Sequence, residues 1–215
     1  MAHGLQRLVV GDEPDQWRSA GFTVDGNECR LGKVVIELVG AKGRRGVHGW
    51  ALAGVSANIE QIETLSAGEV EVEGTVVQGS LDKHTNAVFA IDHVVVETGD
   101  QARTVAAFEA AGLSERRSAT ADTPLGRRQQ SFFWAGRVIV EVVGPLEQDP
   151  SAETQIWGLA LVSSNLQTTA HVLGEHLDEP RDAVQPGRRI ATMQTKQLDI
   201  SVPIVVMSPH VAELL

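Results

Sequence analysis

LGKVVIELVG at residues 31–40 and AGRVIVEVVG at residues 135–144 share one pattern: a turn, a basic residue, an apolar strand with a glutamate at its centre, and a final Val-Gly. So detailed a match exceeds what composition alone produces. It predicts that one structural unit is used more than once along the chain.

Two shorter matches support the repeat. The triplet Gly-Arg-Arg at 126–128 aligns with the same triplet at 187–189, which makes Arg189 the counterpart of Arg128. The apolar stretches at 49–53 and 156–160 align Trp50 with Trp157, and strand alternation then predicts that both indoles fill the core.

The unit is clearest in residues 91–145. A β-branched run at 91–96 predicts a strand, apolar spacing over 100–111 predicts a helix, and runs near 113–119, 128–134 and 137–143 predict three further strands. The unit is therefore β-α-β-β-β. Residues 156–208 repeat it, residues 5–40 give a shortened copy, and residues 47–89 keep an opening strand, a helix around 59–65 and a strand at 69–77.

This division predicts a reduced, degenerate half at 1–87 and a domain of two paired units at 88–215, with 79–86 as the linker. The expected fold class is α+β, with tandem βαβββ units forming cupped mixed β-sheets flanked by helices.

Tandem units of this kind, with a histidine in a first strand and a glutamate in a last strand, resemble the vicinal oxygen chelate superfamily of glyoxalases, extradiol dioxygenases and bleomycin-resistance proteins. His93 and Glu141 occupy those two positions. The resemblance implies a glyoxalase-like fold in which two units supply four ligands to one divalent metal.

Only two of the four ligand positions carry metal-binding side chains. Alignment onto the final unit places Gly158 at the position of His93 and Val205 at the position of Glu141. Alignment onto the first unit gives Arg7 and Glu37, for which a structural salt bridge is the simplest interpretation. The sequence thus predicts an incomplete site, with no certain cofactor and at most a weakly held divalent metal, and predicts that Gly158 opens space in the cup.

Hairpin geometry indicates which side chains share a face. With 135–136 as a two-residue turn, Phe132 is expected opposite Ile139 and Gln130 opposite Glu141. Alternation then puts Arg128 on the same mixed face. The Gly-Arg-Arg alignment adds Arg189 and Met193 from the final unit. We expect the ligand to contact Arg128, Gln130, Phe132, Gly158, Arg189 and Met193.

Each candidate also has a structural interpretation. His93 fits a core or edge histidine as well as a functional one, and the two arginines fit rim residues paired with surface acids. Glu141 is harder to explain structurally, because a carboxylate at the centre of an apolar strand costs several kcal/mol to bury without a partner. Burial would also raise its pKa and prepare it as a general base.

Composition narrows the functional classes. The chain has 215 residues, 42% of them hydrophobic, and a formal net charge of -10, with 18 Lys and Arg against 28 Asp and Glu. This balance argues against nucleic acid as a partner. No apolar run or leader predicts a membrane span or export, and the single Cys29 makes no internal disulfide, so a cytoplasmic location is expected.

Three functions remain open at this point. The first is binding of a small anionic organic molecule in the cup, with Glu141 and His93 as candidate catalytic residues and turnover of the ligand left open. The second is a metal-dependent lyase, isomerase or dioxygenase whose metal is held by His93 and Glu141. The third is an interaction module whose cup is filled by its own side chains. A homodimer is compatible with all three.

Overall fold

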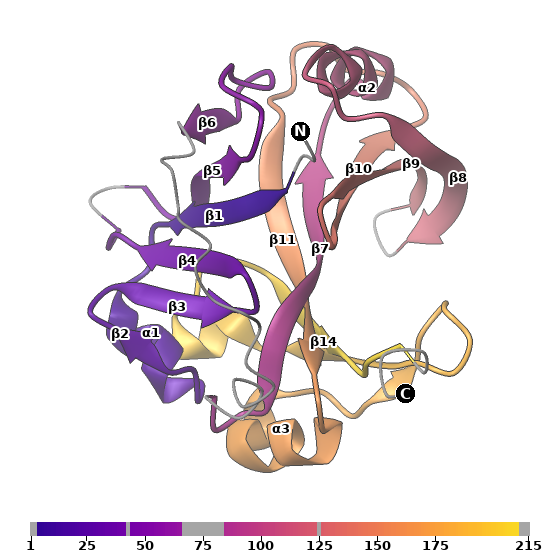
Figure 1. Ribbon diagram of the computed structural model, residues 1–215. Helices are drawn as coiled ribbons and strands as arrows, with labels where there is room; N and C mark the ends of the chain where they lie inside the picture. Colours follow the sequence, from indigo (N-terminus) through magenta and orange to yellow (C-terminus); the bar gives the residue numbers. More distant parts are fainter. Residues whose placement is uncertain (1–3, 42–43, 66–83, 124–125, 211–215) are drawn as a thin grey trace.

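The computed structural model describes residues 4–41, 44–65, 84–123 and 126–210. Within them the chain forms a six-stranded sheet of order β2-β3-β4-β1-β5-β6 and an eight-stranded sheet of order β12-β13-β14-β11-β7-β10-β9-β8. Figure 1 shows the two sheets side by side, with helix α3 at one end of the larger sheet and helix α2 at the other.

The smaller sheet contains one full unit. It runs β1 (Leu5–Val10), α1 (Pro14–Ser19), β2 (Val24–Asp25), β3 (Glu28–Leu31) and β4 (Val34–Leu38), and β4 returns parallel to β1. The reduced unit that follows consists of β5 (Val47–Leu52) and β6 (Glu63–Leu65). The helix expected around 59–65 is wrong: Ile59 and Ile62 are buried in a tight turn, and the next three residues pair with β5 in parallel. The strand expected at 69–77 and most of the expected linker lie outside the described residues.

The larger sheet contains two full units. The first is β7 (Val88–Glu97), α2 (Gln101–Ala110), β8 (Glu115–Thr123), β9 (Gly126–Ala135) and β10 (Val138–Pro145). The second is β11 (Gln155–Ser163), α3 (Leu166–Leu173), the 3₁₀ turn η1 (Gly174–His176), β12 (Arg181–Asp182), β13 (Arg189–Met193), η2 (Thr195–Leu198) and β14 (Ile204–Met207).

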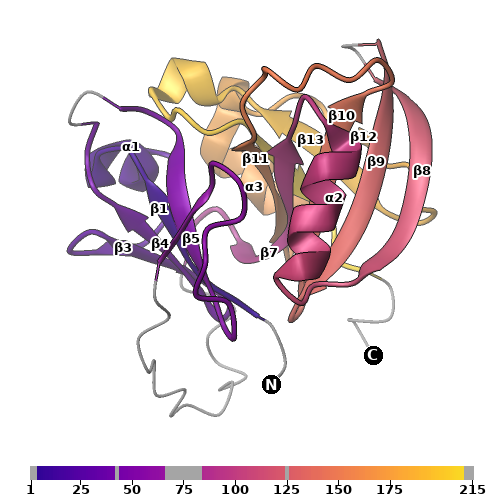
Figure 2. The same cartoon turned by 90° about the horizontal axis from the view of Figure 1, so that it is seen from above.

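The two first strands, β7 and β11, lie antiparallel at the centre of this sheet, and each pairs in parallel with the last strand of its own unit. The sheet curls around one face (Figure 2). The fold is therefore the predicted α+β arrangement of βαβββ units in cupped mixed sheets.

Matching hydrogen bonds fix the strand-to-helix connection in both units. Asp100 and Asn165 cap α2 and α3 by accepting backbone N–H groups of the first turn. Thr98 bonds Thr104 at 2.7 Å, and Ser163 bonds Thr169 at 2.7 Å. The second unit is thus a structural repeat of the first even where the sequences differ.

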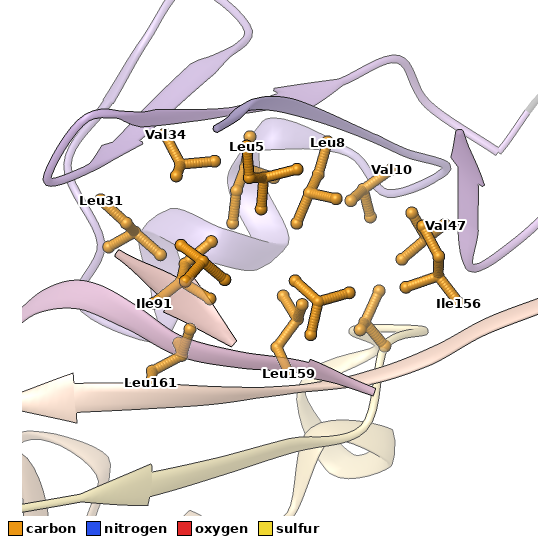
Figure 3. Close-up of a cluster of buried hydrophobic side chains, with 14 of the residues drawn as sticks. Leu5, Leu8, Val10, Leu31, Val34, Val47, Ile91, Ile156, Leu159 and Leu161 are labelled. Atoms are coloured by element: carbon orange, nitrogen blue, oxygen red, sulfur yellow. The ribbon is translucent and has the colours of Figure 1, made fainter. Parts of the chain in front are cut away.

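The smaller and the larger sheet each pack one face against the other, and the side chains between them form one core. Leu5, Leu8 and Val10 of β1 pack toward Ile156, Leu159 and Leu161 of β11 (Figure 3). The spacing of these buried residues is apolar-x-x-apolar-x-apolar, which an unbroken strand of period two cannot put on one face.

A β-bulge in the first strand of each unit explains the spacing. The pairing registers leave an extra residue at this place in every such strand: Gln6 in β1, His48 in β5, Asp92 in β7 and Trp157 in β11, while β7 has a second extra residue at Phe89. A bulge turns two consecutive side chains to the same side. Each bulged residue and the residue after it therefore face away from the core.

Asp12 ties the two sheets together. Its fully buried carboxylate accepts the Trp17 indole N–H at 3.1 Å and the backbone N–H of Ser201, and lies 3.4 Å from the Arg45 guanidinium. The first of these partners comes from α1 and the second from the segment before β14. One carboxylate thus links the beginning and the end of the described chain.

We expect Asp12→Ala to lower the free energy of unfolding by about 2 to 4 kcal/mol, because it leaves buried donors without an acceptor. Asp15→Ala is the control: its side chain is 91% exposed and pairs only with Arg18 in α1, so its effect should stay below about 0.5 kcal/mol. Denaturant unfolding of both variants measures the difference. Equal effects would show that Asp12 does not link the sheets.

Candidate functional site

The β9–β10 hairpin sets the concave face of the larger sheet. Its turn is Gly136-Arg137, with Gly136 at φ +72°, and Glu141 pairs with Phe132 rather than with Gln130. The predicted pairing was therefore displaced by two residues. Because a displacement of two keeps side chains on the same face, the predicted sharing of a face by Arg128, Gln130, Phe132, Ile139 and Glu141 is confirmed.

Glu141 lies at the middle of this face. It accepts a hydrogen bond from the Gln130 side-chain amide at 2.6 Å. Burial raises the pKa of Glu141, while the nearby charge of His93 and the Gln130 bond act in the opposite direction and do not cancel it. Glu141 is thus a half-buried carboxyl that holds its proton more strongly than an exposed glutamate.

His93 reaches the same face through the bulge at Asp92. It is 8% exposed, and its Nδ1 lies 2.5 Å from Asp92 Oδ2, although the two groups are not aligned for a regular hydrogen bond. The other oxygen of Asp92 accepts from Arg188 at 2.9 Å. Asp92 was not among the site residues predicted from the sequence, although the spacing Ile91-x-x-Val94-x-Val96 is typical of a strand with a bulge.

The arginine of the final unit that faces the cup is Arg188. Val205 pairs with Thr192, as Glu141 pairs with Phe132, so Arg188 and not Arg189 is the counterpart of Arg128. The predicted placement of Arg189 is wrong: it is exposed, lies 3.5 Å from Asp182 and donates to the Pro180 carbonyl.

The placement of Met193 is wrong for the same reason. The alignment of the two Gly-Arg-Arg triplets was off by one residue, and a shift of one residue in a strand turns a side chain to the opposite face. Met193 therefore packs in the core, where its side chain is only 3% exposed. Trp157 also departs from its prediction. As a bulge residue it leaves the core and is 44% exposed, whereas Trp50 is fully buried.

The register confirms the alignment of the two remaining ligand positions. Val95 pairs with Glu141, and Ala160 pairs with Val205, which makes Gly158 the counterpart of His93. The space expected at Gly158 is not there: a Cβ at Gly158 would lie 3.0 Å from the Pro203 carbonyl oxygen. The irregular segment before β14 therefore closes this part of the cup.

These residues do not fit the four-ligand metal site that the family resemblance implies. Glycine and valine provide no side-chain donor, and the described ranges contain no group of three or more His, Cys, Asp or Glu placed to hold a metal. In the first unit, Arg7 donates to Glu37 at 2.7 Å, as the sequence predicted, and that carboxylate is neutralised by an internal partner.

We expect added Zn²⁺ or Mn²⁺ to leave the thermal stability of the protein unchanged. A specific site with a dissociation constant one hundredth of the metal concentration would stabilise the fold by about 2.7 kcal/mol, a shift that thermal melts readily detect. A rise in melting temperature that disappears in His93→Ala would instead show that a metal binds at this position.

Asp92 gives the site a defined pH dependence. Burial alone would raise its pKa, but the contacts with His93 and Arg188 outweigh burial and lower it from 3.8 to about 2. A lowered pKa means that the ionised form stabilises the fold. This contribution is fully present above the ordinary value of 3.8 and is lost as the pH falls toward about 2.

We therefore expect Asp92→Asn to lower the free energy of unfolding by about 2 to 4 kcal/mol at pH 7, with the gap to wild type narrowing as the pH falls toward the lowered pKa. Asp182→Asn is the control, because this 94% exposed carboxylate faces Arg189 only at the surface. Chemical unfolding across the acid range tests the expectation, and a gap independent of pH would contradict it.

The concave face just described lies on a sheet with the glyoxalase-like fold, as the order and pairing of its βαβββ units show. No protein-family model matches the chain, and no curated protein sequence matches it. Similar solved structures include methylmalonyl-CoA epimerase from Mycobacterium tuberculosis, at 16% identity and a TM-score of 0.47, covering 60% of this chain and 93% of that one.

Two further solved structures have comparable values. A variant of Streptomyces coelicolor methylmalonyl-CoA epimerase in complex with 2-nitronate-propionyl-CoA has 16% identity and a TM-score of 0.45, covering 58% of this chain and 96% of that one. A hypothetical protein from Bacillus halodurans C-125 has 14% identity and a TM-score of 0.43, covering 56% of this chain and 94% of that one.

Among the described residues, none of the helices has the length and hydropathy that a membrane crossing requires.

Proposed function

We propose that the concave face of the larger sheet binds a small organic anion, and that Glu141 and His93 exchange a proton with it. The observation that carries this proposal is Glu141 itself. It is a carboxyl with a raised pKa on an otherwise largely apolar strand, and its only hydrogen-bond partner among the described residues is Gln130.

Comparison with Glu37 supports a role beyond structure. Glu37 occupies the same place in the first unit, where Arg7 neutralises it at 2.7 Å, so burying it costs little. Glu141 has no such ion pair within the described residues. Burying a carboxyl without an ion-pair partner lowers the stability of the fold. A role for Glu141 in ligand binding or proton transfer would explain why a carboxyl is found there.

The surroundings of Glu141 suit a small organic molecule. Phe132, Ile139 and Val95 are half-buried side chains of the same face, so they offer apolar contact while remaining reachable from solvent. A neutral carboxyl donates a hydrogen bond to a ligand oxygen, and its ionised form accepts a proton. Both forms are accessible near the raised pKa, which is the property of a general acid or base.

We expect Glu141→Gln to leave stability unchanged or raise it by up to about 1 kcal/mol, because the substitution removes a desolvated charge. Glu37→Gln, the matched control, should lower stability by about 1 kcal/mol through loss of its pair with Arg7. Thermal melts of both variants measure these effects.

Ligand binding completes the test. Small monocarboxylates that bind the wild type in a ligand-observed NMR screen should lose at least about tenfold in affinity in Glu141→Gln and none in Glu37→Gln. A loss of several kcal/mol of stability in Glu141→Gln, with unchanged ligand affinity, would make Glu141 a structural residue.

A further inference from the structure

The internal symmetry of the larger sheet relates its two cup arginines. Arg128 lies four residues before Phe132 on β9, and Arg188 lies four residues before Thr192 near β13. Because Phe132 pairs with Glu141 and Thr192 with its counterpart Val205, the two arginines occupy the same position in paired units. Their surroundings nevertheless differ.

Arg188 is saturated by internal partners. It is 2% exposed and donates to Asp92 at 2.9 Å, to Gln185 at 2.6 Å and to the Ser208 carbonyl at 2.8 Å, with His210 at 3.1 Å. The carboxylate that it binds comes from the bulge of β7. One end of the cup is therefore occupied by the side chain of Asp92.

Arg128 is left without such a partner. It makes no hydrogen bond or ion pair with any described residue, is only half-buried, and lines a hollow of about 390 Å³ together with Gln155 and Pro145. The bulge residue that corresponds to Asp92 is Trp157, which supplies a large apolar ring instead of a carboxylate. The two ends of the cup thus have the same cation, but only one has an internal anion.

We propose that Arg128 binds the carboxylate of a small ligand in the way that Arg188 binds Asp92, and that Trp157 packs against the flat apolar body of that ligand. The proposal rests on the proposed function and names its ligand class, a planar monocarboxylate. Register places Trp157 beside Val95, whose other neighbour is Glu141. The ring of Trp157 and the carboxyl of Glu141 therefore border the same apolar floor.

The dimensions agree with a small molecule. Arg128 pairs with Pro145, four residues from Glu141 along β10, which is roughly 13 Å of strand. Gln130 and Val143 pair on the same face between them. An interval of this length accommodates a single ring whose carboxylate is held at one end by a guanidinium fork.

The rim of the hollow restricts ligand charge. Glu97, Asp149 and Glu153 also line it, and none of them forms an ion pair with Arg128. Hydrogen bonds from Ser151 lower the pKa of Asp149 and keep it ionised. These carboxylates repel a second negative charge, so a dicarboxylate should bind no better than a monocarboxylate.

Calorimetric titration of wild-type protein with benzoate, benzamide, cyclohexanecarboxylate and isophthalate tests the proposal. Benzoate should bind at least about tenfold more tightly than benzamide, since a charged hydrogen-bonded pair contributes that much, and isophthalate should not exceed benzoate. Arg128→Gln should remove the preference for benzoate over benzamide. Arg127→Gln is the control, because Arg127 is an exposed neighbour on the opposite face, paired across the sheet with Asp122.

A second pair of variants tests the ring contact. Trp157→Leu should weaken benzoate about fivefold and remove its advantage over cyclohexanecarboxylate, whereas Val172→Ala, at a 38% exposed position of α3, should change neither. Melting temperatures verify that each variant is folded. The absence of benzoate binding, or equal losses in Arg128→Gln and Arg127→Gln, would overturn the proposal.

The two proposals fail separately. Benzoate affinity that depends on Arg128 but not on Glu141 would reject the proton-exchange role and keep the carboxylate site. Affinity that depends on Glu141 but not on Arg128 would reject the carboxylate site alone.

Discussion

One extra residue in the first strand of each unit determines both the core and the cup. The bulges at Gln6, His48, Asp92 and Trp157 let an apolar-x-x-apolar-x-apolar sequence place all its apolar side chains on the buried face. Without the extra residue, alternation would turn half of each strand over and expose Val94 or Leu159. The two side chains released from the core then belong to the concave face, so the same constraint that closes the core supplies the site.

The larger features of the fold follow from local patterns in the sequence. The glutamate-centred strands, the βαβββ order and the shared face of Gln130, Phe132 and Glu141 depend on alternation, which survives an error of two residues in the hairpin register. The helix expected around 59–65 failed because Ile59 and Ile62 have a spacing that a buried turn satisfies as well as a helix does. Periodicity over so few residues does not separate the two.

The sequence alone could not predict which individual side chains face the cup, and the reason is physical. Two arginines stand side by side at 188 and 189, and an alignment error of one residue exchanges the buried side chain with the exposed one. Which arginine enters the cup is decided by the pairing of β13 with β14 and by Asp92 three strands away. A contact between residues so distant in sequence leaves no local pattern, and the same holds for the closure of Gly158 by Pro203.

The cup is symmetric in backbone and asymmetric in chemistry, and the bulge positions account for much of that difference. Asp92 on β7 binds the arginine of the opposite unit and fills one end, whereas Trp157 on β11 leaves Arg128 available at the other. The acids at the strand centres differ in the same way, since Arg7 neutralises Glu37 while Glu141 has only an amide for a partner. In a repeated fold, a buried charge can thus have an internal ion-pair partner in one copy of the unit and none in another. Arg128 and Glu141, which form no ion pair with the described residues, lie on the same concave face, and for this reason we propose that one ligand satisfies both.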